Sequence, residues 1–192
     1  MDPESMDGKM RSCTRTYPVP VLRKGFGLLC SHLVECCNPF IAVDHIKVEG
    51  KESTSFHAHT GVQMITYFVD GAFKTESSMW SYPILGLTRF DADFYHMETP
   101  VTDANHSSAE LFKVWIPYEH STSIQYSQCF SQFYTLDDVT ILREEDNSAE
   151  LRVLSGSTSG IFGPIETDPP VCFFDLYLKQ SSPNVLIAYL CL

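Results

Sequence analysis

Hydrophobic and polar positions alternate in short runs along this chain, and turn-forming residues separate the runs. The runs are rich in β-branched and aromatic side chains, which pack well on a pleated sheet. They predict strands at 62–69, 111–116, 139–143, 151–154, 171–178 and 185–192. Helical periodicity is scarce, and the best candidate for a helix is short and lies at 27–36. The pattern therefore predicts an all-β sandwich or barrel.

The length and the composition of the linkers predict how the chain divides. Its 192 residues suffice for one full domain with a reduced partner. A boundary is predicted between about residues 116 and 136, where Pro117 and several Ser and Gln residues indicate a crossing segment. We expect a flexible N-terminal segment or cloning remnant at 1–16, a main domain at 17–135 and a smaller β segment at 136–192.

The charge balance bears on the kind of partner. Twenty-four acidic and thirteen basic side chains give a formal net charge of -11, and the Lys and Arg residues are scattered. Phosphate contact depends on concentrated positive charge, so direct binding to nucleic acid is not expected. Any role at DNA would run through a protein partner.

The cysteines and the apolar runs indicate the compartment. Seven cysteines without a CxxC spacing disfavour a disulfide framework and a structural zinc site, and they fit buried thiols in a reducing compartment. The first ten residues are polar and lack the apolar core of a secretory signal. No run reaches the roughly 18 apolar residues of a membrane span. We therefore expect a cytoplasmic protein that is not embedded in a membrane.

Two histidines open the first candidate site, in the stretch FHAHTG at 56–61. If 56–69 is one strand, side chains alternate between its faces, so His57, His59, Gln63 and Tyr67 share a face. The two imidazoles then stand about 7 Å apart at their bases and can converge on one ion. An HxH pair alone is a weak signal, because a hydrogen-bonded surface pair has the same spacing.

A second stretch, FYHMETP at 94–100, supplies a further imidazole and a carboxylate. In an extended segment, His96 and Glu98 fall on one face while Tyr95 and Met97 take the other. Three imidazoles and a carboxylate from two strands would form an open, four-ligand metal site. The alternative is a solvated imidazole and carboxylate near the turn before Pro100. The other histidines, His32, His45, His106 and His120, lack such partners and are interpreted as structural or solvated.

These motifs together resemble the metal-binding signature of the pirins, a family of the cupin superfamily. HAHTG is followed by a Tyr-containing strand, an Asp-Gly turn and then HMETP. Upstream, NPFIAVDHI resembles the opening strands of the family. Downstream, ELFKVWIPYE resembles the strand after the site, and LRVLSGSTSGIFGPIETDPPVCFFDLYL resembles the bridge into the second cupin domain. The resemblance covers about residues 22–178.

The resemblance implies a fold and a ligand set. Pirins have two stacked cupin barrels, each a double-stranded β-helix or jelly roll, with one metal in the first. The resemblance thus makes 17–135 the metal-binding cupin domain and 136–192 a rudimentary second cupin. It gives the ligand roles to His57, His59, His96 and Glu98. One divalent transition metal is implied, in the first place Fe(II), with Ni, Cu, Mn or Zn as alternatives.

The chain also departs from the family pattern. Thr60 stands where pirins usually have Arg, and Gln63 stands where they usually have Glu. An uncharged Gln63 could hydrogen-bond a metal-bound water but cannot act as a general base. The approach to the third histidine, GLTRFDADFYH, lacks the family's Gly-rich motif. The pocket wall is therefore expected to differ.

Two functions follow from the resemblance. The first is quercetin 2,3-dioxygenase-like oxidation of a small aromatic, flavonol-like substrate, with Glu98 as the catalytic residue that relays a proton. The second is a non-catalytic, metal-dependent regulator, similar to a transcription co-regulator, that acts through a protein partner in the cytoplasm and the nucleus. Phe56, Tyr67, Phe94 and Tyr95 are candidates for apolar walls, with ordinary core positions as the alternative. The apolar run at 185–192 would also suit a homodimer contact.

Overall fold

The structure, a computed structural model, describes residues 39–49, 53–54, 57–75, 80–81, 85–90, 94–101, 108–118, 129–146 and 148–178. Apart from one 3₁₀ turn, η1 (Leu136–Asp138), all regular structure in these residues is β-strand. The first ten strands are β1 (Ala42–Glu49), β2 (His57–His59), β3 (Val62–Asp70), β4 (Phe73–Thr75), β5 (Trp80–Ser81), β6 (Leu85–Phe90), β7 (Phe94–His96), β8 (Glu98–Pro100), β9 (Ser108–Pro117) and β10 (Cys129–Tyr134). The others are β11 (Thr140–Arg143), β12 (Ala149–Ser155), β13 (Ser157–Thr158), β14 (Ile161–Phe162) and β15 (Phe173–Leu178). The prediction of an all-β fold is confirmed.

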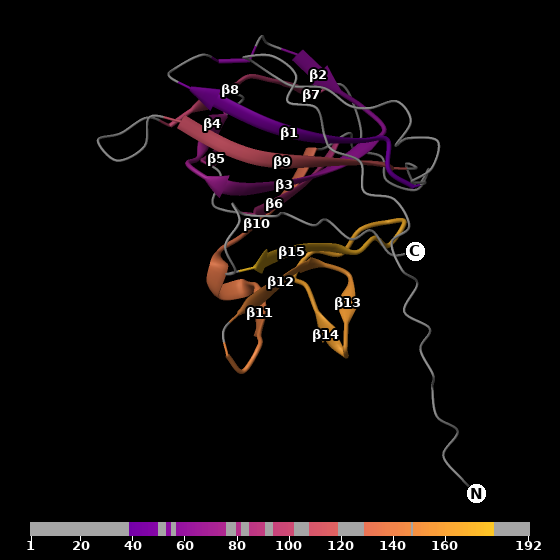
Figure 1. The fold of residues 1–192 in the computed structure, drawn as a ribbon. Coiled ribbons are helices and arrows are strands. Elements are labelled where there is room, and N and C mark those ends of the chain that lie inside the picture. Colours follow the sequence, from indigo (N-terminus) through magenta and orange to yellow (C-terminus); the bar gives the residue numbers. More distant parts are fainter. Residues whose placement is uncertain are drawn as a thin grey trace, which may run out of the picture.

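The largest sheet has five antiparallel strands in the order β1-β9-β3-β6-β10. In Figure 1 the small sheet β2-β7 lies at the top of the molecule, above β1, and the small sheet β5-β4-β8 lies at the left, near one end of β1 and β9. A three-stranded sheet, β11-β12-β15, and the hairpin β13-β14 lie below the five-stranded sheet. The predicted strands at 62–69, 111–116, 139–143, 151–154 and 171–178 correspond to β3, β9, β11, β12 and β15.

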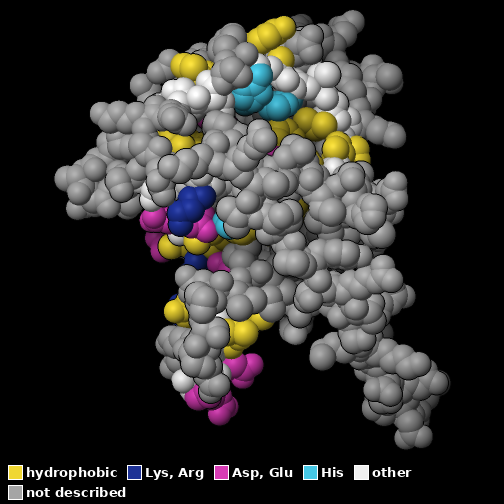
Figure 2. All heavy atoms as spheres, turned by 45° about the horizontal axis from the view of Figure 1, so that its top comes forward, with side chains coloured by type: hydrophobic (Ala, Val, Ile, Leu, Met, Phe, Trp, Pro, Cys, Tyr) yellow, Lys and Arg dark blue, Asp and Glu magenta, His cyan; other side chains and the backbone are white. Residues whose placement is uncertain are grey.

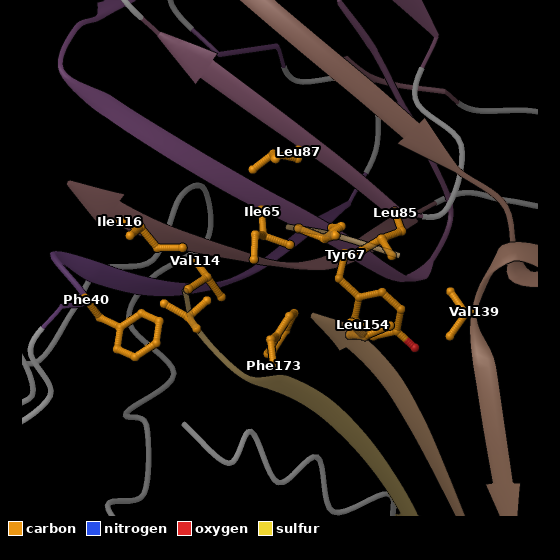
Figure 3. Packing of buried hydrophobic residues seen from close by; sticks show 12 residues of the cluster. Phe40, Ile65, Tyr67, Leu85, Leu87, Val114, Ile116, Val139, Leu154 and Phe173 are labelled. Carbon is orange, nitrogen blue, oxygen red and sulfur yellow. The ribbon is translucent and has the colours of Figure 1, made fainter. Parts of the chain in front are cut away.

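Strand β9 separates two buried layers. On its outer face, Val114 and Ile116 belong to a hydrophobic core that also takes in Leu154 and Phe173 from β12 and β15. Figure 3 shows these side chains meeting between the five-stranded sheet and the lower strands. The inner face carries Leu111, which packs in a second core with Ile46, Val48, Phe68 and Phe73. Side chains directly opposite each other share a face, so the register extends this inner face to neighbouring strands.

The prediction of one strand at 56–69 is wrong. The chain breaks after β2, at Thr60 and Gly61, and Gly61 has a φ of 65°, a backbone conformation that glycine adopts without strain. Strand β2 then pairs with β7, whereas β3 joins the five-stranded sheet. The break uncouples the alternation of β3 from that of β2, so the histidine face of β2 does not continue along β3 as predicted.

Other expectations meet different outcomes. The acidic residues Glu144, Glu145 and Asp146 are exposed in the turn between β11 and β12. The expected helix at 27–36 and strand at 185–192 lie outside the described residues. No helix among the described residues has the length and apolar character needed to cross a bilayer. The division into 17–135 and 136–192 stays a prediction, since the core on the outer face of β9 draws on both parts.

A buried polar contact between β3 and the C-terminal strands explains why Tyr67 is not a pocket wall. Its ring is fully buried in the outer core, and its hydroxyl donates to Asp175 Oδ2 at 2.5 Å. Arg152 Nη1 donates to the same hydroxyl at 3.0 Å. Tyr67 thus ties β3 to β12 and β15 and points away from the inner face.

We expect Tyr67→Phe to lower the free energy of unfolding by about 1 to 3 kcal/mol, because Asp175 and Arg152 lose a buried hydrogen-bond partner. Urea denaturation at neutral pH measures the change. Tyr177→Phe, at an exposed position on β15, is the control and should stay within about 0.5 kcal/mol of wild type. Equal effects of the two substitutions would contradict a stabilising hydrogen bond of Tyr67 with Asp175 and Arg152.

Candidate metal centre

Three histidines are brought together by the pairing of β2 with β7. His57 and His59 lie two residues apart on β2, so their side chains point to the same side. His96 stands directly opposite His57 in the antiparallel register. Directly opposed residues in such a ladder also share a face, so all three imidazoles lie on one side of this small sheet.

The three rings form a compact group, called here the histidine cluster (His57, His59 and His96). One ring nitrogen from each lies within 4.8 Å of the others. The ring centroids of His57 are 4.8 Å from His59 and 4.5 Å from His96. Because a metal–imidazole bond is about 2.1 Å long, nitrogens on one ion stand about 3 to 4 Å apart. Small rotations of the rings would therefore suffice to hold one metal ion.

The surroundings of the cluster combine burial with an opening. His96 is buried, whereas His57 and His59 are half-buried. Histidine side chains reach the surface near the top of the view in Figure 2. The indole of Trp115, on β9, lies 4.7 Å from the ring of His59 between centroids, and its Nε1 donates to Asp44 Oδ2 at 2.7 Å. The cluster therefore faces the inner face of the five-stranded sheet.

The electrostatics of the cluster favour neutral imidazoles. The pKa of His59 is lowered to about 4, mainly by burial and also by the neighbouring His96, His57 and Lys113, while Glu98 opposes the change. A ring that stays unprotonated through the physiological range keeps its nitrogen lone pair available. The site residues thus fit a metal ion by donor type, by spacing and by protonation state.

Glu98 lies close to the histidine cluster, on the next strand, and its place in a four-ligand set stays a prediction. The chain changes sheet after His96, so Glu98 belongs to β8 and pairs with Thr75 of β4. Its Oε2 forms an ion pair with Lys113 Nζ of β9. Burial raises the pKa of Glu98, but Lys113, His96 and His57 together lower it below its usual range. The carboxylate therefore stays ionised and is held by an ammonium group.

The remaining predicted pocket residues lie elsewhere. Gln63 is buried on β3, where its Nε2 donates to the Asp168 carbonyl and its Oε1 accepts from Asp168 N at 3.4 Å. Its amide is thus directed to the loop before β15 and not to a metal-bound water. Tyr95 is 55% exposed, which makes it neither a wall nor a core residue. Phe56 and the side chain of Phe94 lie outside the described residues.

Among the histidines beyond the motif, the structure describes His45, whose contacts agree with a structural role. Its ring stacks on Phe112 at 4.4 Å, and its Nε2 lies 2.8 Å from Glu110 Oε1. His32, His106 and His120 lie outside the described residues. His45 therefore serves as a reference histidine that belongs to the sheet surface and not to the cluster.

The sequence interpretation missed the polar residues of β9 and β1. Lys113 and Trp115 alternate with the apolar Val114 and Ile116, and a lysine in such a strand is normally assigned to solvent. Both faces of β9 are buried, so Lys113 is instead 4% exposed. The signal that could have found it is the apolar character of the strand on both sides of the lysine.

No protein-family model matches the chain. Among curated proteins, Pirin-like protein 2 of Arabidopsis thaliana is 22% identical over 168 residues, which cover 84% of this chain and 49% of the relative. Pirin-1 of the same plant is 24% identical over 168 residues, which cover 84% of this chain and 54% of the relative. The chain thus spans about half the length of the curated relatives it matches.

Solved structures share the fold. Quercetin 2,3-dioxygenase from Acinetobacter baumannii superposes with a TM-score of 0.66 at 17% identity, covering 80% of this chain and 58% of that one. GK1651 from Geobacillus kaustophilus superposes with a TM-score of 0.63 at 20% identity, covering 87% of this chain and 66% of that one. These likenesses identify an all-β cupin fold.

The depressed pKa of His59 predicts how the stability of the metal-free protein depends on pH. The folded ring takes up a proton near pH 4, whereas an unfolded histidine does so near 6.5. The contribution of His59 to the free energy of unfolding is therefore fully present above about pH 6.5. It is lost as the pH falls toward 4, because the unfolded histidine binds a proton more readily than the folded one. Urea denaturation in chelator should show this fall, and His59→Gln should make it shallower. Identical pH slopes for the two proteins across this range would contradict the assignment.

Proposed function

We propose that the chain, which is similar to pirins at low sequence identity, is a metal-binding cupin protein whose histidine cluster holds one divalent transition-metal ion. The observation that carries the proposal is the meeting of three ring nitrogens within 4.8 Å. Imidazole is a good ligand for Fe, Ni, Cu and Zn. We propose Fe(II) as the ion, with Ni, Cu, Mn and Zn as alternatives.

Glu98 is the proposed fourth ligand. Its carboxylate is ionised and lies within electrostatic reach of His96 and His57. A carboxylate beside three imidazoles completes a common ligand set for a catalytic metal. In the structure Oε2 of this carboxylate is paired with Lys113, so we propose the other oxygen, Oε1, as the donor to the ion.

The proposed activity is oxidation of a small flavonol-like substrate, of the quercetin 2,3-dioxygenase type. The proposal draws support from the cupin fold that the chain shares with the solved quercetin 2,3-dioxygenase. When bound, the ion would supply Lewis-acid and redox chemistry toward a substrate hydroxyl group and O₂. The chain itself would contribute Glu98, which can accept the hydroxyl proton, and buried surroundings that exclude water from His96 and Glu98.

A specific contact favours a second function, that of a non-catalytic, metal-dependent regulator that binds a protein partner. Lys113 engages the carboxylate that the catalytic mechanism needs as a ligand and a proton acceptor. A site restrained in this way could hold an ion without turning over substrate. The net charge of -11 would suit a basic partner surface.

Metal content tests the proposed ion site. Protein purified without an affinity tag, loaded anaerobically with Fe(II) and desalted, should retain about one equivalent of iron by mass spectrometry. His59→Ala should retain less than about a tenth, because two imidazoles hold the ion far more weakly. His45→Ala, which removes a histidine outside the cluster, should retain as much as wild type. Less than about a tenth of an equivalent in wild type would exclude both proposed functions.

Oxygen consumption separates the two functions. With quercetin as substrate, the iron-loaded wild type should consume O₂ at least about 100-fold faster than His59→Ala. His45→Ala should retain the wild-type rate. If wild type and His59→Ala consume O₂ at equal rates while only wild type holds iron, the catalytic proposal fails and the regulatory one stands.

A further inference from the structure

Trp115 connects the histidine cluster to the five-stranded sheet. Its indole lies 4.7 Å from the ring of His59 between centroids, and the two ring planes are inclined by 59°. In the sheet, Trp115 stands directly opposite Ala42 of β1 and Met64 of β3. Strand β9 is thus paired on both sides at this position, which fixes the backbone that carries the indole. Trp115 is therefore well placed to support a neighbouring side chain.

Strand β2, which carries two of the three histidines, depends on such support. It pairs with β7 over three residue pairs, from His57 with His96 to His59 with Phe94. Two short strands by themselves are marginally stable in water. His59 is the last residue of β2, just before the break at Gly61, and its side chain is half-buried. The orientation of its ring is therefore expected to depend on what packs against it.

Asp44, on β1, fixes the indole in turn. Its Oδ2 accepts a hydrogen bond from Trp115 Nε1 at 2.7 Å. A hydrogen bond to a carboxylate is stronger than one between neutral groups. The bond anchors the polar edge of the indole, and turning the ring away from His59 would break it. A chain of contacts thus runs from Asp44 through Trp115 to the histidine cluster.

The carboxylate of Asp44 is costly to keep in this place. Its Oδ1 is buried and has no hydrogen-bond partner among the residues that the structure describes. Burial raises the pKa of Asp44, although the bond from Trp115 and the charge of Lys113 oppose the change. An apolar side chain would avoid the free-energy cost of a desolvated oxygen without a partner. Packing alone therefore does not explain Asp44, whereas the need of the indole for an acceptor does.

We propose that Asp44 and Trp115 are positioning residues that hold the ring of His59 in the orientation needed for a metal ion on the histidine cluster. The inference rests on the proposed metal site and deepens it by naming two residues outside the ligand set. Residues that orient a ligand contribute to metal affinity although they do not touch the ion. Loss of the hydrogen bond between Asp44 and Trp115 should therefore weaken metal binding while all the proposed ligands remain.

Co(II) titration of the full chain tests this proposal through affinity and visible absorption. Trp115→Phe, which keeps an aromatic ring but lacks the N–H donor, should lower the Co(II) affinity about tenfold, and so should Asp44→Ala. Both variants should change the absorption spectrum of the bound ion, since the spectrum reports the ligand geometry. The double variant should bind no more weakly than either single variant, because both substitutions remove the same hydrogen bond. Glu110→Ala, which removes a carboxylate bonded to His45, is the matched control and should bind like wild type.

Asp44→Asn separates the hydrogen bond from the charge. Its amide oxygen can still accept from Trp115 Nε1, so the Co(II) affinity should stay within about threefold of that of wild type. A loss of about tenfold in Asp44→Asn would assign the effect to the charge and overturn the inference, and so would wild-type affinity in Trp115→Phe. These two variants decide the question even if Asp44→Ala does not fold. Both outcomes leave the proposed metal site standing, whereas no Co(II) binding by wild type would overturn that site together with the inference.

Discussion

Burial of β9 on both faces is the constraint from which the rest of the structure follows. Its outer residues, such as Val114 and Ile116, join the core shared with the C-terminal strands. Of its inner residues, Lys113 is buried and Trp115 is half-buried, and the polar groups of both find partners inside the protein. Trp115 finds Asp44 and Lys113 finds Glu98, so one strand fixes the polar groups that surround the histidine cluster.

The sequence predicted what depends on local alternation. The period of two in β3, β9 and β12 is visible without any tertiary information, and it also places His57 and His59 on one side of β2. The prediction of which β3 side chains share a face with the histidines was wrong, because Gly61 breaks the strand. Such a break shifts every later side chain relative to the earlier ones. For this reason Gln63 and Tyr67, assigned to the metal side, pack on the outer face instead.

The position of Glu98 could not be predicted from its spacing to His96. An i, i+2 pair shares a face only while the strand continues in one sheet, and here the chain changes from the sheet of β7 to that of β8. The partner of Glu98 is fixed by a contact between separate sheets, and the alternation of side chains along one strand cannot predict such a contact. Resemblance to the pirins supplied the residue types of the proposed site, whereas the pairing with Lys113 required the tertiary structure.

The histidine cluster and the ion pair are electrostatically coupled. The low pKa of His59 reflects both burial and the cost of adding a charge beside His96 and Lys113. A divalent ion would introduce that charge at the same place. Lys113 alone would oppose it, but Lys113 with Glu98 is a neutral pair, which leaves the cluster able to receive a cation. The pairing thus reconciles a buried lysine with a proposed cation site beside it.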